Sequence, residues 1–193
     1  MMTLVDFADP GLIVLSPHRL MRGLSPAVLN ELKTKITALF EVDELPDGPD
    51  AWQKIDDFLK PGRTPQAQFV VYGLEPGRFH LLTLRDFDAA RQMMPYFHSE
   101  LYARLDVSIF DHVILNKMLA MPNDTEEAFL TFEHDKHNAV ARIKEQEYQL
   151  AFLLSPIRPG LIKTVADGGE RMPRKSTYFH PKPPSGLVMH RLD

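Results

Sequence analysis

One stretch near the C-terminal end of the chain concentrates the residue types that bind phosphate. Residues 169–182 read Gly-Glu-Arg-Met-Pro-Arg-Lys-Ser-Thr-Tyr-Phe-His-Pro-Lys, with four successive candidate side chains at Arg174, Lys175, Ser176 and Thr177. Two cations and two hydroxyl groups can donate several charge-assisted hydrogen bonds to one phosphate. The two prolines stiffen the stretch and so lower the entropy lost on binding. The alternative is a solvated basic loop anchored by Tyr178 and Phe179.

A second pair of candidates, His18-Arg19, follows the expected strand Leu12–Leu15. A His-Arg pair at the end of a strand can bind a phosphate or a carboxylate. The alternative is an arginine that pairs with a surface acid. The anion-binding hypothesis gains weight if the fold brings His18 close to Lys175.

Other residues that could do chemistry give no recognised pattern. His134 and His137 are three residues apart and can share one helix face, but no known metal-binding spacing includes them, so we predict no metal site. The chain lacks a Gly-x-Ser-x-Gly motif, a phosphate-cradling glycine loop and a Glu-x-x-His pair, so we assign no catalytic residue. We interpret one acidic group as a solvated loop: Asp43, Glu44, Asp47 and Asp50.

The composition excludes several classes of function. The chain has 193 residues, a net charge of −4 and no cysteine, so disulfides, thiolate catalysis and cysteine-ligated zinc are ruled out. The negative charge argues against general nucleic-acid binding, although a local basic site is compatible with it. No apolar run approaches the roughly 20 residues that a membrane span needs, and residues 1–9 are no signal peptide. We expect a cytoplasmic protein, and the strand-like opening favours a truncation of a longer one.

Apolar periodicity and capping residues predict the elements that would position these candidates, with Ser25, Asp86 and Asp135 as expected N-caps and Glu75-Pro76-Gly77 as an expected hairpin turn. The expected helices are Pro26–Phe40, Ala51–Leu59, Asp86–Met93, Ser99–Leu105, Val107–Leu119, Asp135–Gln146 and Arg158–Ala166. The expected strands are Thr3–Phe7, Leu12–Leu15, Ala67–Leu74, Arg78–Leu84, Glu127–Phe132, Tyr148–Leu154 and Gly186–His190. This order indicates a single α+β domain over residues 1–193, with a mixed β-sheet partly covered by helices.

The stretch Gly169–Lys182, with Ser185–Val188 after it, resembles the C-terminal signature of the prokaryotic family called domain of unknown function 1015. That signature reads Gly-Glu-Arg-Met-Pro-x-Lys-Ser-Thr-Tyr-Phe-Tyr-Pro-Lys, then Ser/Thr-Gly-Leu-Val. Three other stretches also look similar to the family: Asp9–Leu20, Leu105–Leu115 and Glu147–Pro156. The resemblance covers the family's C-terminal half. The Asp-Gly-His-His-Arg motif of its earlier half, which is similar to the active-site motif of ParB-related proteins and free-serine kinases, does not occur here.

The resemblance implies the C-terminal part of a ParB/serine-kinase-like phosphotransferase or nucleotide-binding protein. This part would contribute an anion pocket from His18, Arg19 and residues 174–177, without catalysis of its own. The implied partners are a phosphorylated small molecule or a nucleotide, with Mg²⁺ if the full-length protein is a kinase, and an N-terminal half that carries the motif. A non-catalytic structural or interaction domain is the alternative hypothesis. A nucleic-acid-binding module is a further one, which the acidic net charge opposes.

Overall fold

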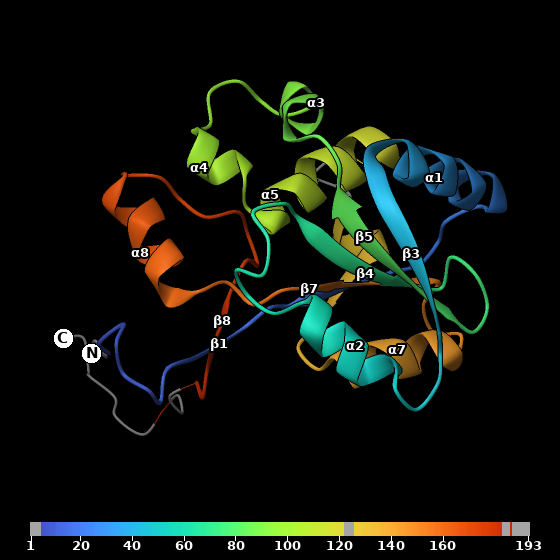
Figure 1. The fold of residues 1–193 in the computed structure, drawn as a ribbon, viewed down its shortest axis with the longest axis horizontal. Coiled ribbons are helices and arrows are strands. Elements are labelled where there is room, and N and C mark those ends of the chain that lie inside the picture. Colours follow the sequence, from blue (N-terminus) through green and yellow to red (C-terminus); the bar gives the residue numbers. More distant parts are fainter. Residues whose placement is uncertain (1–4, 122–125, 183–185, 187–193) are drawn as a thin grey trace.

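A six-stranded sheet runs through the middle of the molecule (Figure 1). The computed structural model describes residues 5–121, 126–182 and 186. In spatial order the strands are β3 (Phe40–Pro46), β5 (Arg78–Leu84), β4 (Gln68–Tyr72), β7 (Leu150–Leu154), β2 (His18–Met21) and β6 (Leu130–Glu133). The α+β class is confirmed. Each neighbouring pair in this sheet is antiparallel rather than part of a mixed arrangement, because apolar periodicity does not encode strand direction.

Helices pack on both faces of the sheet. They are α1 (Pro26–Leu39), α2 (Ala51–Phe58), α3 (Phe87–Gln92), α4 (Glu100–Ala103), α5 (Asp106–Ile109), the π-helix η1 (Phe110–Met118), α6 (Glu126–Phe129), α7 (Lys136–Lys144) and α8 (Pro159–Asp167). The expected N-caps are confirmed, since Ser25, Asp86 and Asp135 each accept a backbone N–H of the first turn. None of the helices in the described ranges is long and apolar enough to cross a membrane.

The strands alternate their side chains between two apolar layers. In β4, Phe69 and Val71 join a core cluster with α1, α5 and η1, whereas Val70 and Tyr72 join a second cluster with α2 and α7. Figure 1 shows α2 and α7 side by side below the sheet and α1 above it. Because both faces are covered, β7 is apolar throughout and was readily predicted, whereas the equally buried β2 begins with His18-Arg19 and was not predicted as a strand.

A separate two-stranded ribbon joins the two ends of the described chain. Strand β1 (Ile13–Leu15) pairs with β8 (Tyr178–His180). Strand β8 lies inside Gly169–Lys182, which we call the signature stretch. Thr3–Phe7 and Leu12–Leu15 were expected as a hairpin or as two consecutive strands, and the first of these strands is wrong within the described residues. Residues 5–7 form no strand, because the side chains of Asp6 and Asp9 accept nearby N–H groups and turn the chain locally. The signature stretch takes the place of that partner strand.

Three further expectations differ from the structure. Residues 40–46 form the edge strand β3 rather than the helix end and acidic loop that we expected, and its acidic residues point to solvent. The strand expected at Glu127–Phe132 is shifted, since α6 precedes β6. The last expected strand, Gly186–His190, lies outside the described residues apart from Gly186.

Candidate anion-binding site

His18 and Arg19 lie within an internal strand rather than after one. Strand β2 begins at His18, between β7 and β6, and Ser16-Pro17 separates it from β1. Proline lacks an N–H group, so the chain breaks from one ladder before it enters the next. Because adjacent strand residues point to opposite faces, the side chains of His18 and Arg19 diverge. The structure therefore gives the two residues different surroundings.

Arg19 connects the sheet to the signature stretch. Its side chain is only 1% exposed, and its Nη2 donates to the backbone carbonyl of Lys175 at 3.2 Å. Its Nη1 donates to the carbonyl of Pro17. The guanidinium also lies 5.5 Å from the ring centroids of both Phe110 and Phe132, where the negative ring faces favour a cation. Arg19 thus fixes the position of the Lys175 backbone.

The signature stretch forms a tight turn at this anchor. Lys175 has a φ of +55°, and the buried Ser176 hydroxyl donates to the carbonyl of Pro173 at 2.5 Å. The side chains of Arg174 and Lys175 are exposed, and Thr177 is half-buried. The fold therefore brings Arg19, Lys175 and Ser176 together, and it places His18 on the other face of β2.

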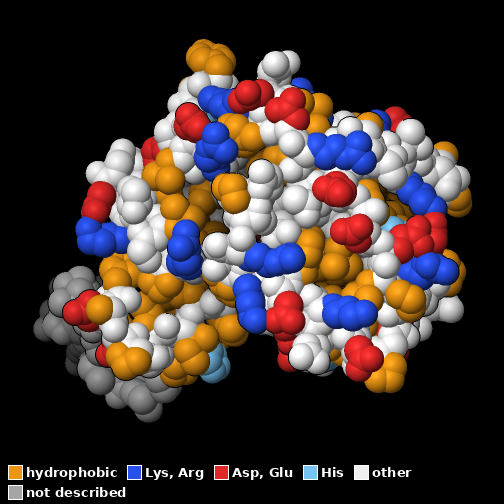
Figure 2. Space-filling view, viewed as in Figure 1, with side chains coloured by type: hydrophobic (Ala, Val, Ile, Leu, Met, Phe, Trp, Pro, Cys, Tyr) orange, Lys and Arg blue, Asp and Glu red, His pale blue; other side chains and the backbone are white. Residues whose placement is uncertain are grey.

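His18 lines a cavity of about 340 Å³. The cavity lies where the β1–β8 ribbon meets α2 and α7, and Figure 2 shows the outline of the molecule indented there. Its polar lining residues are Ser16, His18, Asp56, Lys60, His134, Asp135, Lys136 and His137. A cavity of this size suits a small ligand, because ligand sites typically enclose about 300–1,000 Å³.

The imidazole of His18 is neutral and has a fixed tautomer. Burial is the largest cause that lowers its pKa from 6.5 to about 4, and the charges of Arg19 and Lys136 lower it further. Nδ1 accepts the backbone N–H of Leu154 at 3.3 Å. A neutral imidazole with Nδ1 as acceptor carries its proton on Nε2. His18 therefore brings an N–H donor, and not a charge, to the lining of the cavity.

Ser16 adds a second buried donor to the same cavity. The residue is 4% exposed, and within the described part of the chain its hydroxyl has no hydrogen-bond partner. Buried hydroxyl groups are normally hydrogen-bonded, so an unpartnered one beside a cavity points to a ligand or a water in that cavity.

The start of α7 brings a cation, Lys136, and an acid, Asp135, to the cavity. Asp135 caps this helix by accepting the N–H of Asn138 at 2.9 Å, and Lys136 forms an ion pair with Asp56. The first-turn N–H groups of a helix have no acceptor within the helix and carry partial positive charge. Burial lowers the pKa of Lys136. The cavity thus combines a cation, a helix amino end and an acid that an incoming anion can replace.

The signature stretch also reaches the edge of this cavity. Leu15, which lines it, pairs with Tyr178 of β8. The Tyr178 ring lies 4.0 Å from the ring of His134, another lining residue. Lys182 Nζ lies 4.9 Å from the Tyr178 ring. Strand β8 therefore braces the wall of the cavity that contains His18.

A second cavity of about 310 Å³ adjoins the first, and Lys60 and Pro61 line both. Its other basic lining residues are Arg63, Arg104 and Arg158. Figure 2 shows basic side chains around a hollow in the middle of this face. These residues, like Ser16 and Lys136, could not be predicted from the sequence as site residues, because they come from distant parts of the chain and share no motif.

Comparison with known proteins gives similarity in structure only. No family model matches the chain, and no curated protein matches it. A conserved hypothetical protein from Pyrococcus furiosus is similar with a TM-score of 0.48 and 15% identity, over 92% of this chain and 60% of that chain. Free serine kinase in complex with AMP is similar with a TM-score of 0.48 and 13% identity, over 92% of this chain and 57% of that chain. This chain thus spans less than two thirds of these proteins, and its function is argued from its own residues.

Proposed function

We propose that this chain binds the phosphate group of a small phosphorylated molecule or nucleotide in the His18 cavity. In this proposal it serves as the C-terminal part of a ParB/serine-kinase-like phosphotransferase or nucleotide-binding protein, and it does not catalyse phosphoryl transfer alone. The observation that carries the proposal is the pair of buried donors, His18 and the unpartnered Ser16, at a cavity closed by Lys136 and the amino end of α7.

The donor set suits a phosphate. A neutral imidazole N–H, a hydroxyl, a lysine ammonium and helix N–H groups can each donate to a different phosphate oxygen. Lys136 is held by Asp56 in the free protein. An incoming phosphate would take the place of the Asp56 carboxylate at Lys136. Lys136 would then keep an anionic partner, and the ligand would lie against His18.

The other predicted residues keep a place in the proposal. Arg19 and Ser176 hold the backbone of the signature stretch, as their hydrogen bonds to main-chain carbonyls indicate. From this fixed backbone, Arg174, Lys175 and Thr177 would offer charge and hydroxyl groups to a further anionic group of the ligand, outside the His18 cavity, which none of them lines. Their contribution is separable from that of His18, because Arg19, which anchors Lys175, points to the opposite face of β2 from His18.

The size of the ligand follows from the two adjoining cavities. Lys60 and Pro61 border both, so a ligand with its phosphate beside His18 can extend its remaining part toward Arg63 and Arg158. A nucleotide has this form, with a compact phosphate group and a larger body whose base and ribose can accept hydrogen bonds from arginine side chains. Inorganic phosphate would fill only the first cavity.

Calorimetric titration with inorganic phosphate, phosphoserine and AMP tests the proposal. We expect saturable binding of at least one of them, and an affinity at least tenfold weaker in Ser16→Ala and in Lys136→Met. The matched control is Lys163→Met, which removes an exposed lysine that also pairs with an acid, Asp167. Equal affinity in all four proteins, or no binding of any ligand at millimolar concentration, would contradict the proposal.

Membership of the domain of unknown function 1015 family is part of the same proposal, and it rests on the resemblance of Gly169–Lys182. The gene itself offers the test. An in-frame segment upstream that encodes Asp-Gly-His-His-Arg would support the family and supply the other half of the site. An unrelated upstream sequence in the same reading frame would contradict it.

One observation favours a second candidate function, a non-catalytic structural or interaction domain. The buried Arg19 is used to hold the Lys175 carbonyl, which is a structural use of the signature stretch. The two functions differ in the behaviour of Arg174→Met, which changes an exposed residue. Weaker phosphate binding at unchanged stability supports the anion site, whereas unchanged binding supports the structural domain.

A further inference from the structure

A buried histidine on β5 is left without a hydrogen bond. His80 is 3% exposed, and neither of its ring nitrogens has a hydrogen-bond partner among the residues that the structure describes. Burying a polar group without a partner costs free energy. A buried imidazole of this kind needs a partner that the described residues do not supply.

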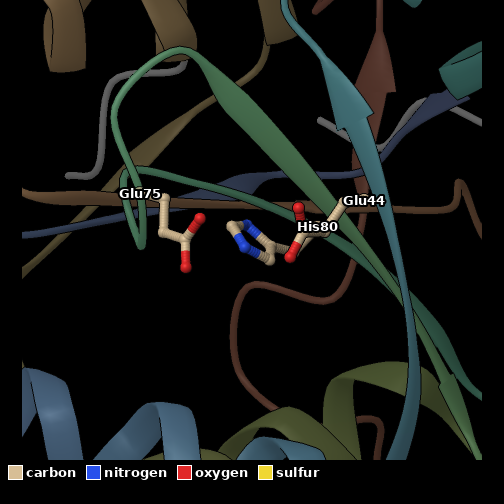
Figure 3. Close-up of side chains that lie close together, drawn as sticks. All are labelled: Glu44, Glu75 and His80. Atoms are coloured by element: carbon tan, nitrogen blue, oxygen red, sulfur yellow. The ribbon is translucent and has the colours of Figure 1, made fainter.

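Two carboxylates flank this imidazole. Glu44 lies directly opposite His80 in the β3–β5 ladder, and Glu75 lies in the turn between β4 and β5. Figure 3 shows the His80 ring between the two carboxylates, which approach it from different elements. The potential ligand atoms of the three residues all lie within 4.8 Å of one another.

We propose that Glu44, Glu75 and His80 bind a divalent transition-metal ion such as Zn²⁺ or Mn²⁺. Metal–ligand bonds of about 2.0–2.2 Å place opposite ligands of one ion about 4 Å apart, so a small inward movement of the two glutamates closes the site. One imidazole and two carboxylates suit borderline metals, and three protein ligands leave a position for water. The ion would satisfy the buried imidazole.

The basic neighbours of the two glutamates are compatible with an ion. Lys33 contacts one oxygen of Glu75, and Arg78 contacts one oxygen of Glu44 at 2.8 Å. Each carboxylate therefore keeps its second oxygen for the metal. Such outer contacts orient ligands in metal sites.

This inference is independent of the proposed phosphate site. None of the three ligands lines the His18 cavity or the second cavity beside it. The ion would join the edge strand β3 to the β4–β5 turn and to β5, so it would stabilise that end of the sheet. Stability with and without metal can therefore be measured without any phosphorylated ligand.

Calorimetric titration of the metal-free chain with Zn²⁺ and with Mn²⁺ tests the site, with urea denaturation as a second readout. The test variants are Glu44→Gln and Glu75→Gln, which remove a ligand charge and keep the buried His80. The matched control is Glu41→Gln, the same substitution on an exposed residue three positions earlier in β3, on its other face. All four proteins are compared in the same non-chelating buffer.

We expect one metal ion per chain at micromolar concentration, with an affinity at least tenfold weaker in both test variants and unchanged in the control. We also expect the urea midpoint to rise on metal addition in the wild type and the control alone. Absence of a one-to-one site would overturn the inference. Binding that is equally strong in the wild type, Glu44→Gln and Glu75→Gln would also overturn it, because other side chains would then hold the metal.

Discussion

Acidification tests the state of His18 on which the proposed phosphate site depends. The pKa of His18 is about 4 in the folded protein, mainly because the ring is buried, against 6.5 for the free side chain. As the pH falls, the unfolded chain therefore binds a proton at this residue before the folded chain does. The contribution of His18 to stability is present above pH 6.5 and is lost as the pH falls toward 4.

The magnitude follows from these two pKa values. Since one pKa unit corresponds to about 1.4 kcal/mol, the linkage relation gives a loss of about 2 kcal/mol between neutral pH and about pH 5. The loss reaches about 3 kcal/mol near pH 4. Other groups also have shifted pKa values, such as Asp47 and His80, and they are present both in the wild type and in a variant that lacks His18. Their effects therefore cancel when two proteins that differ only at His18 are compared.

The assay is urea denaturation of the wild type and of His18→Gln in phosphate-free buffers between neutral pH and about pH 5. Glutamine keeps an acceptor for the Leu154 N–H but does not titrate. Over this range, we expect the unfolding free energy of the wild type to fall by about 2 kcal/mol more than that of His18→Gln. The matched variant His180→Gln, at an exposed position, should keep the wild-type slope. Parallel curves for wild type and His18→Gln would refute the reasoning.

Three substitutions test the backbone that positions the site. Arg19→Met removes a buried guanidinium from two main-chain carbonyls. It should lower the unfolding free energy by roughly 2–4 kcal/mol and speed proteolysis of the signature stretch. The control Arg171→Met, at an exposed position, should do neither. Gly73→Ala should cost at least about 2 kcal/mol in a urea titration, because φ is +106° and the new methyl group would overlap the carbonyl oxygen of Gln149. Gln146→Gly should raise the thermal midpoint by the equivalent of about 0.5–1 kcal/mol, because this residue, which follows the C-cap Glu145 of α7, has a φ of +62°.

Local signals in the sequence predicted much of the fold. The Ser25-Pro26 start of α1, the hairpin turn before β5 and the Asp135 cap of α7 each depend on a few neighbouring residues, and each is found in the structure. Strand β3 was missed because an edge strand exposes its acidic residues and so resembles a loop. The pairing of β1 with β8 was missed because it joins the two ends of the chain, and no local pattern encodes such a contact.

The site was predicted only in part, for a related reason. His18 and the signature stretch could be singled out because their residue types are unusual for their positions. The opposite directions of the His18 and Arg19 side chains could not be predicted, because they depend on a strand that begins at His18 itself. Ser16 and Lys136 carry no signal as single residues. Only the fold places a buried hydroxyl and the amino end of α7 at one cavity.

The most direct test of the account is a phosphate titration followed by the NMR signal of the His18 side-chain N–H. With Nδ1 occupied by Leu154, the proton lies on Nε2 and would donate to the bound phosphate. We predict a saturable shift of this signal, with the same dissociation constant that calorimetry gives and with a dissociation constant at least tenfold higher in Lys136→Met. A His18 signal that stays unchanged while phosphate binds would contradict the central claim.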